Sequence, residues 1–162
     1  MKSVYALIVF VTGLCMPVDT VIAASRKENQ NAVDLELAGK CLIYSFSYQR
    51  MIVEPFGLEL GVSMLGGGSS SSSTTIVFYT VGGKFYLIQK DASPYIGVGY
   101  VGVSASTSSG PFSDSNSANY GYVGPGFEYR SEGGFLVRGG VYGLIASGGW
   151  QVWPGLTIGV AF

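Results

Sequence analysis

Four charged residues of this chain occupy positions from which they could form an ion-pair network. Glu36, Glu59, Glu128 and Arg138 each lie in a segment where large apolar residues alternate with small or polar ones, and each falls on the polar side. Alternation of this kind directs the two sets of side chains to opposite faces of a β-strand. Because a charge that leaves water needs a partner, we expect these residues to pair inside the protein, with Arg138 beside Glu128 and with Glu59 or Glu36 as a further partner across the barrel.

The sequence is poor in groups that catalyse reactions or hold cofactors. It has no histidine, the residue that commonly activates a serine or carboxylate nucleophile. Cys41 is the single cysteine after residue 24, so no His/Cys cluster suggests a metal site. The net charge of −1 comes without a basic stripe, which argues against nucleic acid as a partner. We expect no enzymatic activity, no cofactor and no metal; a lipid-modifying enzyme with a Ser-Lys or carboxylate-pair site is a less favoured alternative.

The elements that position the charged residues are expected to be β-strands. Charged residues make up 12% of the chain, aromatic residues 14%, and 25 of the 162 residues are glycine, a composition that suits strands with flexible connections. After the N-terminal segment, no run reaches the ~18 continuous apolar residues of a membrane helix. Strand-like segments cover residues 32–38, 41–51, 57–65, 74–88, 95–104, 119–130, 135–146 and 153–162.

The facing pattern of these segments favours a membrane barrel over a soluble sheet. In the last segment, Leu156, Ile158 and Val160 alternate with small residues, and most other segments repeat this asymmetry. A soluble antiparallel sheet also alternates, but its water-facing side would carry more Lys, Glu and Thr than Gly and Ser. A large apolar exterior around a small polar interior is typical of a transmembrane barrel.

The connections between the segments indicate how many strands there are. Those at 52–56, 90–93 and 131–134 are short, whereas those at 66–73, 105–118 and 147–152 are longer or rich in Gly and Ser. Bacterial barrels have short periplasmic turns, longer external loops and an even number of strands. Residues 32–38 supply the eighth strand, followed by a tight hairpin turn at Gly39 and Lys40. We predict an all-β, eight-stranded antiparallel up-and-down transmembrane β-barrel, with an interior too narrow for a porin-like pore.

The N-terminal segment has the pattern of a secretory signal peptide. Lys2 precedes an apolar run from Val4 to Val18, and Ala23 and Ala24 offer a small-residue cleavage site. We expect that residues 1–24 are cleaved and that residues 25–162 form one barrel domain.

Three segments carry a family resemblance: Ser93-Pro-Tyr-Ile-Gly-Val-Gly-Tyr100, Gly124-Pro-Gly-Phe-Glu-Tyr129 and the terminal Gly159-Val-Ala-Phe162. They resemble the small outer-membrane β-barrel family that includes outer membrane protein X and the barrel domain of outer membrane protein A. The resemblance implies the fold and a Gram-negative outer-membrane location, but no activity, because members range from adhesins to enzymes. It also implies that Phe162, Val160 and Gly159 belong to the signal read by the barrel-assembly machinery, although the family usually has glycine where Thr157 lies here.

These observations lead us to expect a monomeric, integral outer-membrane protein with a structural or surface-exposed role, in contact with outer-membrane lipid. The main alternative is an adhesin or ligand-binding barrel that meets a host or surface ligand through external loops 66–73 and 105–118. In that case Phe112, the single aromatic residue of the second loop, is the recognition candidate. A narrow channel through the charged interior is a less favoured alternative.

Overall fold

The computed structural model describes residues 26, 28–69, 72–109 and 112–162 of the chain. The predicted signal peptide, residues 1–24, lies outside the described residues. None of the helices in the described part of the chain has the length and apolar character to cross a membrane. The elements in chain order are β1 (Asn31–Ala38), the 3-10 helix η1 (Gly39–Cys41), β2 (Tyr44–Val53), β3 (Phe56–Ser69), β4 (Ser72–Tyr86), β5 (Ala92–Ser109), β6 (Phe112–Arg130), β7 (Phe135–Ala146) and β8 (Gly149–Ala161).

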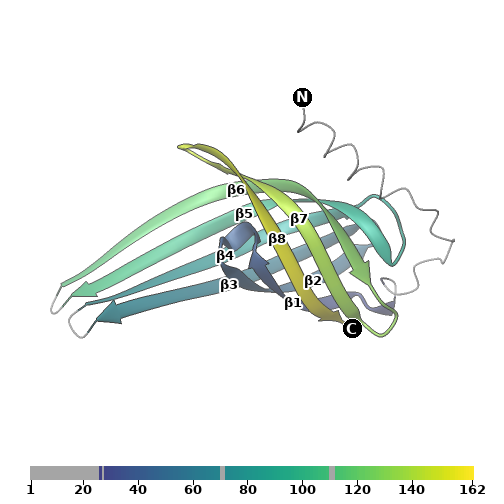
Figure 1. Cartoon of the computed structure of the whole chain (residues 1–162), viewed down its shortest axis with the longest axis horizontal. Helices are drawn as coiled ribbons and strands as arrows, with labels where there is room; N and C mark the ends of the chain where they lie inside the picture. The colour runs from purple at the N-terminus through teal and green to yellow at the C-terminus, as the bar shows by residue number, and fades with distance from the viewer. Residues whose placement is uncertain (1–25, 27, 70–71, 110–111) are drawn as a thin grey trace, which may run out of the picture.

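The strands form one closed barrel in which each strand pairs with its sequence neighbours and β8 returns to β1 (Figure 1). All pairs are antiparallel, so the prediction of an eight-stranded up-and-down barrel is confirmed. The closing seam runs from Ala32 opposite Ala161 to Ala38 opposite Gly155. Closure leaves no strand edge along the barrel wall, which is the condition for placing a sheet in lipid.

The two faces of the wall separate apolar from polar side chains. Outward positions carry exposed large apolar residues on every strand, for example Leu58, Leu60 and Val62 on β3. The intervening inward positions on that strand include buried Glu59 and Ser63. The predicted alternation therefore places an apolar band around the outside of the barrel and polar side chains inside it.

The prediction of long external loops was wrong, because most of these residues continue the strands. The β3–β4 ladder extends to Ser69 opposite Ser72, so the predicted loop 66–73 is largely strand. The predicted loop 105–118 is likewise strand as far as the pair Ser109 and Phe112, and 147–152 contracts to residues 147–148. Serine and threonine are readily accommodated in a ladder whose backbone groups pair continuously, so Ser-rich composition did not mark a loop here. The two hairpins project beyond the rest of the barrel, at the left of Figure 1.

The predicted two-residue turn between the first two strands was also wrong. The chain leaves β1 with positive φ at Ala38 and at Gly39, forms η1, and has positive φ again at Leu42 before β2 begins. Lys40 is buried in this excursion, where its ammonium group reaches two carboxylates of the lumen. The indole N–H of Trp153 donates to the Leu42 carbonyl oxygen at 3.1 Å. These contacts favour an infolded connection over a tight surface turn.

Deleting Phe162 is expected to reduce the amount of folded barrel. The Phe162 amide donates to the Asn31 carbonyl at 2.8 Å, and its carbonyl accepts from the Asn31 amide at 2.9 Å, so the deletion removes a hydrogen-bonded pair from the seam. It also removes an exposed ring from the rim, where aromatic side chains favour the membrane boundary. Heat-modifiable migration on gels measures the folded fraction in membranes. Phe162→Tyr is the control and should fold normally; an unchanged folded fraction after the deletion would refute the expectation.

Candidate functional site

The interior of the barrel has an apolar part and a charged part. The apolar part is a cluster of buried side chains from η1, β4, β5, β6 and β7: Cys41, Phe78, Val101, Tyr122, Tyr142 and Leu144. The charged part lies toward the end of the barrel at which β6 ends and β7 begins. It contains buried Arg26, Asp34, Glu36, Lys40, Glu59, Lys84, Glu128, Arg130 and Arg138. We call these charged residues the lumen network.

Arg138 on β7 connects three strands of the lumen network. It lies directly opposite Glu128 in the β6–β7 register, and its Nε donates to that carboxylate. Its Nη1 donates to Asp34 Oδ2 on β1 at 2.7 Å, and its Nη2 donates to the side-chain carbonyl of Gln49 on β2. The structure thus brings Arg138 and Glu128 together, and it adds Asp34 as a second acidic partner. Glu59 is farther from Arg138, with 3.7 Å between its Oε2 and Nη1.

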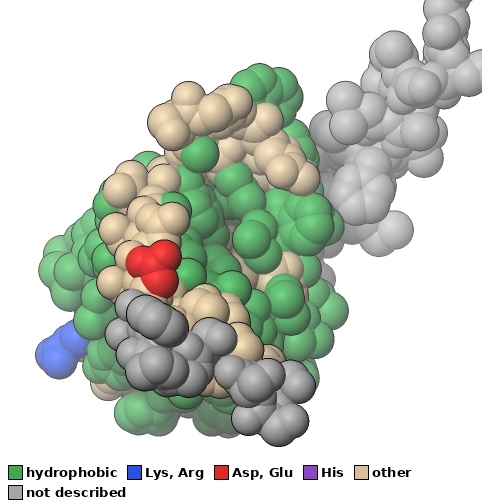
Figure 2. Space-filling view, turned by 90° about the vertical axis from the view of Figure 1, so that its left-hand side faces the viewer, with side chains coloured by type: hydrophobic (Ala, Val, Ile, Leu, Met, Phe, Trp, Pro, Cys, Tyr) green, Lys and Arg blue, Asp and Glu red, His purple; other side chains and the backbone are tan. Residues whose placement is uncertain are grey.

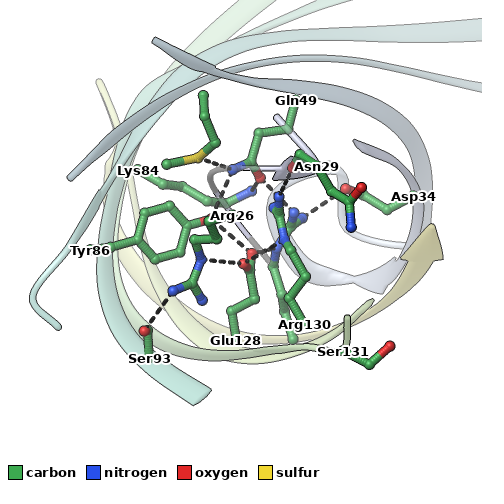
Figure 3. A network of polar contacts seen from close by, with 12 residues as sticks. Arg26, Asn29, Asp34, Gln49, Lys84, Tyr86, Ser93, Glu128, Arg130 and Ser131 are labelled. Carbon is green, nitrogen blue, oxygen red and sulfur yellow. Dashed lines mark hydrogen bonds and ion pairs between the residues drawn. The ribbon is translucent and has the colours of Figure 1, made fainter. Parts of the chain in front are cut away.

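Glu128 is shared by three guanidinium groups, of which those of Arg26 and Arg130 are labelled in Figure 3. Besides Arg138, its Oε1 lies 3.1 Å from Arg26 Nε and 3.3 Å from Arg130 Nε. The Tyr86 hydroxyl donates to Glu128 Oε2 at 2.7 Å. Both oxygens of this fully buried carboxylate therefore face donors, which compensates its loss of hydration.

The two remaining carboxylates pair with lysines. The Lys40 ammonium lies 2.6 Å from Glu36 Oε2 and 2.8 Å from Glu59 Oε1, so η1 is tied to β1 and β3 at once. Lys84 on β4 donates to the other oxygen of Glu59. The Tyr142 hydroxyl donates to Glu36 Oε1 at 2.7 Å. The sequence-predicted carboxylates thus all face the lumen, and each has a cationic partner.

Sequence reasoning missed several members of the lumen network. Lys84 could have been found from strand parity, because it shares the inward set of β4 with Thr80, whereas Val81 and Phe85 face outward. Lys40 and Arg26 could not be found in this way, because neither lies in a strand.

The other predicted site residues lie away from the network. Phe112 begins β6 opposite Ser109, and its side chain lies outside the described part of the structure. Val160 faces outward on β8. Gly159 faces inward where space is short: a Cβ there would lie 2.5 Å from the Val33 carbonyl oxygen, so a larger residue would disturb the seam.

The geometry of the lumen network is that of a structural plug. Its charged side chains are buried, with exposures of 0–5% in the ion pairs, and each carboxylate pairs with at least one cation from another element of the chain. Across the described ranges, no group of three or more His, Cys, Asp or Glu residues is placed to hold a metal ion. The arrangement ties β1, β2, β3, β4, β6 and β7 together across the barrel interior.

Replacing Arg138 with alanine is expected to destabilise the barrel by about 3–5 kcal/mol, since it leaves Asp34 and Glu128 as buried carboxylates with fewer partners. Denaturant unfolding in phospholipid vesicles measures the change. Adding Asp34→Asn should recover part of the loss, whereas adding Glu128→Gln should not, because Arg26 and Arg130 then lose their shared acid. Arg50→Ala, at an exposed cation, is the control. An Arg138→Ala barrel as stable as its parent would refute the role assigned to the network.

Comparisons with known proteins identify the fold. No protein-family model and no curated protein sequence matches the chain. The N-terminal β-barrel domain of Pseudomonas aeruginosa OprF superposes with a TM-score of 0.61 at 15% sequence identity, covering 83% of this chain and 99% of that domain. Ail, the attachment invasion locus protein of Yersinia pestis, solved with the heparin analogue sucrose octasulfate, gives a TM-score of 0.55 at 15% identity. That match covers 82% of this chain and 94% of Ail.

Both matches extend over nearly the whole of the other barrel and over more than four fifths of this chain, and they agree with the closed barrel topology. The chain therefore has the fold of the small eight-stranded outer-membrane β-barrels, as seen in the OprF barrel domain and in Ail.

Proposed function

We propose that the protein is an integral outer-membrane barrel with a structural or surface-exposed role and without catalytic activity. The observation that carries the proposal is the apolar band around the barrel wall. The exposed large apolar side chains have exposures from 37% to 74%, for example Leu60 at 58%, Val98 at 57% and Val160 at 58%. A soluble protein rarely exposes a continuous apolar surface of this extent, whereas lipid tails cover it without cost.

The lumen supports a structural role over transport. Ion pairs of the lumen network join strands that are not neighbours in the wall, β7 with β1 and β7 with β3, and the apolar cluster fills the next layer of the interior. An ion passing through would have to separate buried pairs and then cross an apolar layer, and both steps are unfavourable. In this proposal residues 1–24 are the cleaved export signal, and both ends of the mature chain lie in the periplasm. The projecting β3–β4 and β5–β6 hairpins then extend to the outside of the cell.

The membrane location can be tested through the apolar band. Fractionation should place the protein with outer-membrane markers, in a heat-modifiable form. Leu60→Lys puts a charge on the lipid-facing side and should lower the folded fraction, because a lysine at the bilayer midplane costs about 2–4 kcal/mol. Ser106→Lys, on the exposed face of the projecting hairpin, is the matched control and should fold normally. Recovery in the soluble periplasmic fraction would contradict the proposal.

A second candidate function is the binding of an extended polypeptide at the cell surface, and the strand register favours it. Within the described residues, β6 pairs with β7 only from Gly121 onward, so the segment from Phe112 to Tyr120 is paired with β5 alone. Its other edge presents unpaired backbone donors and acceptors. Such edges accept an additional strand from a partner, with main-chain hydrogen bonds giving affinity.

The charge of the projecting hairpins selects between kinds of ligand. Ail was solved with a sulfated heparin analogue. In this chain, residues 60–83 contain no charged residue and residues 92–127 contain Asp114 as their single charged residue. The end-on view in Figure 2 shows hydrophobic and uncharged polar atoms around this end, with acidic atoms in red and basic atoms in blue at the left margin of the view. Because the two hairpin segments contain no Lys or Arg, a sulfated polyanion would find no cation on them to bind. The hairpins are therefore better suited to a peptide strand than to a polyanion.

Shortening the β5–β6 hairpin tests this second function. A variant in which residues 105–118 are replaced by Asn-Gly lacks most of the unpaired edge, and it should lose binding to immobilised host matrix proteins. The corresponding variant at residues 66–73 leaves the edge of β6 intact but shortens the similar edge of β3, which pairs with β4 alone beyond Val62, so it should retain more binding than the first variant. Immobilised heparin should bind neither variant nor the parent. Absence of matrix-protein binding by the parent, or equal binding by both variants, would reject the peptide-binding function.

A further inference from the structure

Two arginines at the periplasmic end of the lumen share one carboxylate. Arg26 precedes β1 and is 3% exposed, and Arg130 is the last residue of β6 and is fully buried. The Nε atoms of both lie near the same oxygen, Glu128 Oε1, at 3.1 Å and 3.3 Å. Figure 3 shows the two side chains approaching Glu128 from opposite sides. Their guanidinium groups are therefore neighbours around a single acidic oxygen.

These guanidinium groups have more donors than the surrounding protein accepts. Arg26 Nη1 donates to Ser93 Oγ at 2.7 Å and to the Lys90 carbonyl, and Arg130 Nη1 donates to the Asn29 carbonyl at 2.7 Å. Arg26 Nη2, Arg130 Nη2 and Arg130 Nε are buried and have no hydrogen-bond partner among the described residues. Each of these unmatched N–H groups belongs to a side chain that is more than nine-tenths buried.

Charge is unbalanced at the same place. Glu128 also pairs with Arg138, although Arg138 has Asp34 as a second acid. Among the ion pairs of the described residues, Arg26 and Arg130 therefore share one acidic partner, Glu128. A guanidinium group stays protonated in proteins, so this end of the lumen cannot discharge the surplus by losing a proton. A buried charge without a counter-charge is costly, and a bound anion removes both deficits together.

We propose that the periplasmic end of the lumen binds one small monovalent anion of the chloride class, held by the unmatched Nη2 groups of Arg26 and Arg130. One negative charge balances two guanidinium groups against one carboxylate. A multivalent anion such as phosphate is disfavoured, because it would exceed the surplus and lie against Glu128. The bound anion links the segment before β1, which carries Arg26, to the end of β6, which carries Arg130, at the periplasmic end of the lumen.

Chloride dependence of stability tests the site. The protein, isolated from membranes and placed in phospholipid nanodiscs, is unfolded in urea at constant ionic strength with chloride replaced by gluconate, a much bulkier monovalent anion. An anion that binds only the folded state raises stability with the logarithm of its concentration, so the urea midpoint should rise between about 1 and about 100 mM chloride. Bromide should act like chloride. Equal midpoints in chloride and gluconate would overturn the proposal and would indicate that water satisfies the donors.

Variants assign the effect to the two arginines. Arg26→Gln removes the surplus charge, so its urea midpoint should be the same in chloride and gluconate. Arg50→Gln removes an exposed cation at the same end of the barrel and should keep the chloride dependence of the parent. If Arg26→Gln does not fold, bromide anomalous scattering from crystals of the parent decides: a bromide peak beside Arg26 and Arg130 supports the site, and its absence rejects it. Retained chloride dependence in Arg26→Gln would also reject it.

Discussion

The pairing of β1 with β8 is the constraint on which the rest of this structure depends. An open eight-stranded sheet would present two rows of unpaired amide and carbonyl groups to lipid, and each unsatisfied group there costs several kcal/mol. The seam from Ala32 opposite Ala161 to Ala38 opposite Gly155 removes both rows. Once the wall is closed, its inward side chains are confined to a narrow space. The buried charges, the infolded η1 and the apolar cluster are all consequences of that confinement.

The narrow lumen explains why the interior charges are so closely matched. A soluble protein can solvate an unpaired carboxylate by a small movement toward water, but a side chain inside a small closed barrel has no such route. Glu59, for example, meets Lys40 from η1 and Lys84 from β4, so that two separate elements neutralise one inward residue. Pairs of this kind stabilise the barrel chiefly because breaking them leaves a charge stranded, and less through their Coulomb attraction. The lumen network therefore makes the relative positions of the strands mutually dependent.

How far the sequence predicts this molecule depends on whether a feature is local. Inward Glu59 and the number of strands follow from period-2 alternation and from the parity of the connections, both readable along the chain. Lys40 and Arg26 lie outside the strands, and their burial depends on carboxylates that are brought together only by the closed barrel. The prediction of a loop at residues 105–118 was wrong for a related reason. Their Ser-rich composition resembles a loop, but the ladder that holds them extended is set by pairing between two distant segments.

The distribution of charge along the barrel has a consequence for how the chain reaches its final position. In the orientation proposed above, the tips of the hairpins cross the bilayer from the periplasmic side while the wall forms. Residues 60–83 and residues 139–162 contain no charged side chain that would have to cross the bilayer. The connection between β1 and β2 carries Lys40 across, and the β5–β6 hairpin carries Asp114. Hydroxyl and glycine-rich segments are desolvated at far lower free-energy cost than ionised side chains. The composition that makes the projecting hairpins look like featureless loops thus lowers the barrier to their translocation, and the densely charged end is retained on the side from which the chain arrives.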